Sequence, residues 1–296
     1  MTAVTRRAFM GAVAFVALAL SQPAFADDGH PYFGPETVNL LDLLVPPPAK
    51  DSAETKAELL DVKQLMAAVS DSRRQQAIAD DDEGLQPFLA GTSIKVDPAA
   101  APLTTALVQR ILDTEEAVTG PAKKGFARPR PPLVDEAIKP LIKLSKSGSY
   151  PSGHSTNSTA IAIVLAKMLP EKKEELMQRA NDYALSRLIV GVHYRSDLGA
   201  GHAAGALIAQ ALMQTPDFQK EFEPAKAELR KDLGLGMSAR RRAGCYRSSA
   251  SPRNCGSPRC RPHSTQQTVS DPDRFGVGVL KTINSVKSTT SGGVSL

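Results

Sequence analysis

Apolar residues along most of this chain recur every three to four positions, the spacing that places them on one face of a helix. Asp51 or Ser52 can cap the first such segment. A second, more polar helix is expected over residues 71–82. Because the alternating patterns of β-strands are nearly absent, the sequence predicts an all-α helical bundle in a single domain.

Proline and glycine mark the limits of the later helices. We expect these helices over residues 102–119, 152–169, 170–190 and 197–213, with a last one starting at residues 215–217. Gly120-Pro121 is expected to stop the first of them, and Ser196 can cap the fourth. The fourth helix contains Gly199, Gly201 and Gly205, which would allow a close contact with a neighbouring helix.

The N-terminal residues have the form of an export signal. Arg6-Arg7 precede a short apolar run, and Ala24-Phe25-Ala26 fits a cleavage site, so residues 1–26 are expected to be removed. The segment fits either a twin-arginine signal or an ordinary secretory signal. Both interpretations predict a periplasmic or secreted protein. No later segment is long and apolar enough to span a membrane, so we expect no membrane insertion after cleavage.

The positive charge of the chain is concentrated at its C-terminus. Ten Lys or Arg and two Asp lie in residues 239–296, so this segment carries +8 and the rest carries −3 of the total of +5. The mildly acidic body argues against a nucleic-acid partner. Residues 237–296 are rich in Ser, Arg, Pro and Gly and are predicted to be a disordered tail, or a non-native end, after a domain over 27–236. The tail holds all three cysteines, whose spacing to His263 is poor for zinc.

Three short motifs together contain the groups that a phosphate site needs. They are Lys123-x6-Arg130-Pro131, Pro151-Ser152-Gly153-His154 and Ser186-Arg187-x5-His193-x3-Asp197. The Lys and Arg side chains of these motifs can neutralise the charge of a transferring phosphoryl group. The Ser-Gly pair falls where a helix begins, so free backbone N–H groups and the helix dipole would favour an anion there. Since these groups can neutralise and hold a phosphoryl group themselves, no metal or cofactor is expected.

The two histidines of these motifs can divide the chemistry of phosphoryl transfer. One would attack phosphorus, and the other would protonate the leaving alkoxide and later activate water. His193 has Asp197 four residues later to fix its tautomer, whereas His154 has no such partner nearby in the sequence, which fits a proton donor. His202 falls within a helix and is interpreted as a structural histidine.

These motifs resemble those of the type 2 phosphatidic acid phosphatase (PAP2) superfamily, which includes vanadium haloperoxidases. Within it the chain resembles bacterial class A non-specific acid phosphatases, and residues 43–49 and 144–150 extend the likeness. The resemblance implies an all-α fold, a metal-free site and a phosphohistidine. By motif position, phosphate would be bound by Lys123, Arg130, Ser152, Gly153 and Arg187, with His154 as the acid, His193 as the nucleophile and Asp197 as its orienting group.

The expected function is hydrolysis of small phosphomonoesters by an acid phosphatase of broad specificity, with assembly into a homo-oligomer left open. A vanadate-dependent haloperoxidase is an alternative, but such enzymes are usually much longer, and the chain lacks tryptophan for a halide pocket. A membrane lipid phosphatase would need spanning helices. A non-catalytic phosphate-binding protein would not require the complete set of catalytic groups present here.

Overall fold

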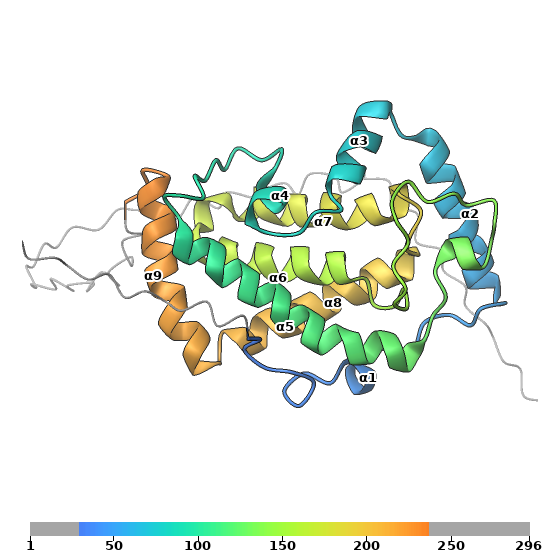
Figure 1. Cartoon of the computed structure of the whole chain (residues 1–296), viewed down its shortest axis with the longest axis horizontal. Coiled ribbons are helices and arrows are strands. Elements are labelled where there is room, and N and C mark those ends of the chain that lie inside the picture. The colour runs from blue at the N-terminus through green and yellow to red at the C-terminus, as the bar shows by residue number, and fades with distance from the viewer. Residues whose placement is uncertain (1–29, 237–296) are drawn as a thin grey trace, which may run out of the picture. The chain divides into compact units, whose positions relative to one another are not determined.

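The helices of the computed structural model surround one central helix, α6 (Figure 1). The structure describes residues 30–236, which lie within one compact unit and contain no β-strand. The α-helices are α1 (Leu40–Leu43), α2 (Ala53–Ala68), α3 (Asp71–Ala79), α4 (Leu85–Leu89), α5 (Pro102–Phe126), α6 (Gly153–Met168), α7 (Lys173–Ile189), α8 (Arg195–Leu212) and α9 (Pro216–Asp232), with 3₁₀ turns η1 (Pro131–Leu133) and η2 (Pro170–Lys172). The predicted all-α fold is confirmed.

Helix α6 is buried on nearly every side because α5, α7 and α8 pack around it. Its small and hydroxyl-bearing residues make this possible, since their polar groups bond within the helix. Thr156 and Thr159 donate to the carbonyls of Ser152 and Ser155 at 2.9 and 2.7 Å. The N-terminus of α6 therefore lies deep in the molecule, where its free N–H groups are shielded from bulk water.

Two glycines of α8 allow it to lie directly against α6. A Cβ on Gly201 would lie 2.6 Å from Ser155 Cβ, and one on Gly205 would lie 2.7 Å from Thr159 Cβ. Gly199 faces open space instead, so the expected close contact is confirmed at two of these three positions. The approach brings the first turn of α8 beneath the start of α6, where the Ser152 N–H donates to the Asp197 carbonyl at 3.1 Å.

The prediction that Gly120-Pro121 stops a helix is wrong, because α5 continues to Phe126. Both residues of the pair are exposed, whereas Val118, Thr119 and Ala122 on the opposite face are buried. A proline inside a helix costs on the order of 3 kcal/mol, and burial of apolar side chains on both sides of it offsets that loss. Because the helix continues past this pair, Lys123 lies on the last turn of α5.

Other boundaries differ by a few residues. Helix α3 ends at Ala79 and not at residue 82, so residues 80–84 form a loop that ends at Gly84 with φ 131°. Helix α8 is capped by Tyr194 and not by Ser196. The predicted export signal and the predicted C-terminal tail lie outside the described residues. Among the described helices, none combines the length and the apolar character that crossing a membrane would need.

Candidate active site

Six of the eight predicted site residues line one cavity of about 460 Å³. They are Lys123, Arg130, Gly153, His154, Arg187 and His193. The other two, Ser152 and Asp197, are completely buried behind this lining. Asp197 accepts from His193 in the lining, and the Ser152 N–H donates to the Asp197 carbonyl. Elements separated by up to 70 residues in sequence therefore contribute to a single site, as the three motifs predicted.

The hydrogen bonds of His193 determine which of its nitrogens carries the proton. A guanidinium group can only donate, so Arg130 Nη1, 3.0 Å from His193 Nε2, requires a lone pair on Nε2. The proton therefore lies on Nδ1, which donates to Asp197 Oδ2 at 3.1 Å. Burial first, and then the charges of Arg130, Lys123 and Arg187, lower the pKa of His193 well below its ordinary value. Both hydrogen bonds and this shift of the pKa favour a neutral imidazole, with the lone pair of Nε2 facing Arg130.

Asp197 is held by more partners than the sequence predicted. Arg128 donates to its Oδ1 at 2.5 Å and also pairs with Glu58 at 2.8 Å, while the Tyr194 N–H donates to Oδ2 at 2.9 Å. Burial raises the pKa of Asp197 to about 6, and Arg128 opposes that rise. The extra arginine two positions before Arg130 was visible in the sequence, but the contribution of Glu58 from α2 was not.

Arg187 and Arg130 are fixed before any substrate binds. Arg187 pairs with Asp81 at 2.8 Å and donates to the Ala77 carbonyl, and its buried Nε has no hydrogen-bond partner among residues 30–236. Arg130 donates to the carbonyls of Ser147 and Val192, each at 3.1 Å. Preorganised cations of this kind need little rearrangement when an anion arrives.

Lys123 lies against the first residue of α6. A Cβ on Gly153 would be 2.8 Å from Lys123 Nζ, so only glycine leaves the ammonium its present position. The ammonium also lies 3.9 Å from Oε1 of the buried Glu115. Ser152 caps α6, because its Oγ accepts from the Ser155 N–H at 3.3 Å. The predicted anion site at a helix N-terminus is thus assembled, although Ser152 itself does not line the cavity.

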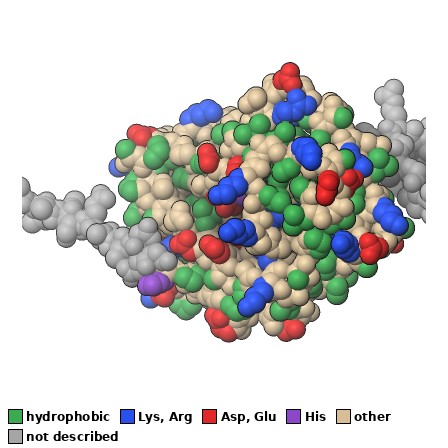
Figure 2. Space-filling model, turned by 45° about the vertical axis from the view of Figure 1, so that its right-hand side comes forward, with side chains coloured by type: hydrophobic (Ala, Val, Ile, Leu, Met, Phe, Trp, Pro, Cys, Tyr) green, Lys and Arg blue, Asp and Glu red, His purple; other side chains and the backbone are tan. Residues whose placement is uncertain are grey.

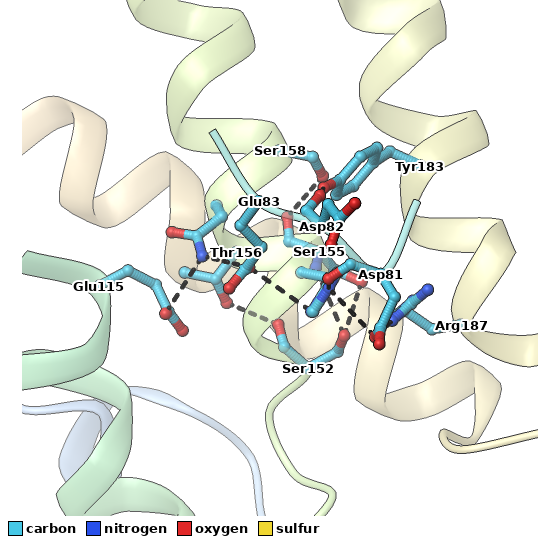
Figure 3. A network of polar contacts seen from close by, with 12 residues as sticks. Asp81, Asp82, Glu83, Glu115, Ser152, Ser155, Thr156, Ser158, Tyr183 and Arg187 are labelled. Atoms are coloured by element: carbon cyan, nitrogen blue, oxygen red, sulfur yellow. Dashed lines mark hydrogen bonds and ion pairs between the residues drawn. The ribbon is translucent and has the colours of Figure 1, made fainter. Parts of the chain in front are cut away.

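His154 has partners that the sequence did not predict. Its Nε2 donates to the Asp81 carbonyl at 3.1 Å, its Nδ1 lies 3.5 Å from Glu83 Oε1, and its ring stacks on Tyr183. Figure 3 shows the loop of residues 81–83 beside the start of α6 and the α7 side chains Tyr183 and Arg187. Burial first, and then Arg187, lower the pKa of His154 well below its ordinary value.

His202 lies apart from this chemistry. Its Nδ1 is 2.8 Å from Thr159 Oγ1, and it is not part of the cavity lining, which agrees with its interpretation as a structural histidine. Within residues 30–236, no group of three or more His, Cys, Asp or Glu side chains is arranged to hold a metal ion.

Comparison with known proteins identifies the family of this chain. Residues 102–221 match the PAP2 superfamily. A non-specific acid phosphatase of Salmonella typhi is 32% identical over 225 residues, which cover 73% of this chain and 90% of that protein. An acid phosphatase of Zymomonas mobilis subsp. mobilis is 34% identical over 151 residues, 50% of this chain and 57% of that one. A crystal structure of a bacterial vanadium-dependent iodoperoxidase aligns with a TM-score of 0.44 at 22% identity, covering 58% of this chain and 52% of that chain.

The chain belongs to the PAP2 superfamily and, within it, to the bacterial non-specific acid phosphatases. It is an enzyme of the phosphoric monoester hydrolase class.

Proposed function

We propose that this enzyme hydrolyses a broad range of small phosphomonoesters through a phosphohistidine on His193 and without a metal ion. The observation that carries the proposal is the hydrogen bonding of His193. Its Nδ1 proton is held by Asp197, and its Nε2 lone pair is directed to Arg130 in the cavity lining. That is the state in which an imidazole is a nucleophile.

Substrate binding would place the phosphoryl group between the cations and the start of α6. Lys123, Arg130 and Arg187 would neutralise its oxygens, with backbone N–H groups at Gly153 adding donors. On binding, a phosphoryl oxygen would replace His193 Nε2 as the acceptor for Arg130. The nitrogen lone pair is then free to attack phosphorus in line with the ester oxygen.

The reaction has two steps, and His154 is the only side chain of the enzyme that loses and regains a proton in them. In the first, the N–P bond to His193 forms, the bond from phosphorus to the ester oxygen breaks, and His154 Nδ1–H gives its proton to that oxygen. In the second, water attacks phosphorus, its proton goes to His154 Nδ1, and the N–P bond breaks. Free phosphate leaves and both histidines are restored.

We also propose export to the periplasm or the medium, as the N-terminal residues indicate. Small phosphomonoesters are the proposed partners, and a nucleic acid is not. Acidic and basic side chains are interspersed on the face shown in Figure 2, which therefore presents no extended basic surface. Assembly into a homo-oligomer is left open.

Denaturing the enzyme in alkaline detergent during turnover of a phosphomonoester labelled in its phosphoryl group, in the presence of excess chelator, tests the mechanism. We expect turnover to persist and an acid-labile phosphoenzyme to be trapped, and we expect His193→Ala to form none. Activity that disappears with chelator and returns with zinc or magnesium would overturn the metal-free mechanism. A phosphoenzyme that survives in His193→Ala would assign the nucleophile to another residue.

A further inference from the structure

The loop between α3 and α4 reaches into the active site and holds the proposed acid. The Asp81 carbonyl accepts from His154 Nε2, while the Asp81 carboxylate pairs with Arg187. The Tyr183 hydroxyl donates to the Asp82 carbonyl, which fixes the loop to α7. Since Nε2 is occupied by the carbonyl, Nδ1 is the His154 nitrogen that exchanges a proton, and Glu83 lies beside it.

Glu83 is held in place by a buried amide. Asn157 Nδ2 donates to Glu83 Oε1 at 2.7 Å and to Glu115 Oε2 at 3.3 Å, and Asn157 is only 2% exposed. One side-chain amide of α6 therefore positions both carboxylates in the cavity lining. Glu83 Oε1, the oxygen that accepts from Asn157, is also the oxygen nearest to His154 Nδ1, at 3.5 Å.

We propose that Glu83 is a positioning residue that keeps His154 in its protonated form until the leaving group takes the proton. This inference rests on the proposed role of His154 as the general acid. Glu83 does not transfer a proton to the substrate. Its carboxylate faces the imidazolium that must be present before the first step, as Asp197 faces His193.

The charges around His154 explain why such a group is needed. Burial and three groups, Arg187, His193 and Lys123, all disfavour the imidazolium. Against them, the loop contributes the Asp81 carbonyl, the Asp81 carboxylate at 3.9 Å and Glu83. The Asp81 carboxylate is already paired with Arg187, and Glu115 lies beside Lys123, so Glu83 is the carboxylate left to compensate His154. Burial raises the pKa of Glu83, as does Glu115, whereas the hydrogen bond from Asn157 and the charges of Lys123 and Arg187 oppose that rise. Tyr183 contributes a neutral face.

Glu83→Gln tests the inference with little change in shape. The new side-chain amide can still accept from Asn157 through its oxygen, but it carries no charge. Because Glu83 is partly exposed, solvent screens its charge, and we expect its loss to disfavour protonation of His154 only moderately. The basic limb of the kcat/KM profile, which reports the protonated acid, should move down by about one pH unit. Near neutral pH, glucose 6-phosphate hydrolysis should fall roughly tenfold, whereas p-nitrophenyl phosphate, whose leaving group departs unprotonated, should change little in the first step.

Two companion variants separate the possible outcomes. Glu116→Gln removes a carboxylate from the same cavity lining without contacting His154, and it should keep the wild-type ratio between the two substrates. His154→Ala tests the underlying mechanism: because His154 also activates water in the second step, the test is kcat/KM, which reports the first step, and a loss of kcat/KM that is equal for both substrates would refute His154 as the acid. If His154→Ala discriminates between the substrates but Glu83→Gln lowers both equally with no shift of the pH profile, Glu83 is merely structural and the inference is wrong.

Discussion

At the scale of single residues, the two histidines of the candidate site, His154 and His193, differ in what surrounds their second nitrogen. His193 has a fully buried carboxylate, Asp197, which itself is neutralised by Arg128. His154 has a backbone carbonyl on one nitrogen and the partly exposed Glu83 near the other. A permanently fixed tautomer suits a nucleophile, whereas a group that gains and loses a proton in each cycle needs a balanced environment.

Asp197→Asn should lower kcat by roughly 10²–10⁴-fold, because an amide cannot accept from Arg128 and His193 at once. If the amide nitrogen faces His193, it forces the proton onto Nε2, the nitrogen that must attack. If the amide nitrogen faces Arg128 instead, two hydrogen-bond donors face each other and neither finds an acceptor there. Steady-state kinetics and the yield of trapped phosphoenzyme should fall together.

Asp61→Asn is the matched control for that substitution. Asp61 pairs with Arg195 at 2.7 Å on the surface, outside the cavity lining. Its loss should leave kcat within about twofold, since exposed ion pairs contribute little. A kcat for Asp197→Asn that stays close to the Asp61→Asn value would show that His193 does not depend on Asp197.

The sequence indicated which residues lie together in the candidate site, because each motif brings its polar groups within a few positions. The His193–Asp197 pair could be predicted because only four residues separate them, with His193 just before the start of α8 and Asp197 in its first turn. The partners of His154 could not, because Asp81 and Glu83 lie about 70 residues earlier, at the end of the helix expected over residues 71–82 and just beyond it. Only tertiary packing of that loop on α7 brings them to the site.

At the scale of helices, burial of one face can outweigh the low helix propensity of individual residues. Helix α5 passes through Gly120-Pro121 because the opposite face is buried, a balance that local sequence rules do not include. The contact between α6 and α8 shows the reverse case, since small residues in one sequence segment correctly indicated a close approach. What the sequence could not tell was which glycines make the contact and which one faces solvent.

Gly205→Ala should destabilise the fold by about 1–3 kcal/mol, because the new methyl would lie 2.7 Å from Thr159 Cβ and α8 would have to move away from α6. Gly199→Ala, at an exposed position of the same helix, should instead stabilise it by up to about 1 kcal/mol. Denaturant unfolding of the two variants measures both effects. If the two variants change the free energy of unfolding by equal and small amounts, α6 and α8 can move apart without loss of stability.

At the scale of the whole molecule, residues 30–236 contain the complete candidate site, so a chain that ends at Gly236 should keep its melting temperature and its turnover. Arg230 makes the last contacts, donating to the carbonyls of Gly236 and Met168 and pairing with Glu171 at 2.8 Å. A chain that ends at Leu229 loses these bonds and should melt at a lower temperature. Loss of turnover in the longer truncation would show that the last 60 residues belong to the functional domain.

The stability of the whole molecule should fall on acidification partly because of His193. Its folded-state pKa lies well below 6.5, so below that pH the unfolded chain binds a proton that the folded chain does not. The contribution of His193 to the free energy of unfolding is therefore fully present above pH 6.5. Below that pH it falls by about 1.4 kcal/mol per pH unit, until the folded-state pKa is reached.

His193→Gln removes this titration. Its deficit in unfolding free energy relative to the wild type should shrink by about 1.4 kcal/mol between pH 7.5 and 5.5, as measured by urea denaturation at both pH values. If the deficit of His193→Gln instead grows between pH 7.5 and 5.5, His193 is already protonated in the folded enzyme across this range. It could not then be the neutral nucleophile that the hydrogen bonds to Arg130 and Asp197 require.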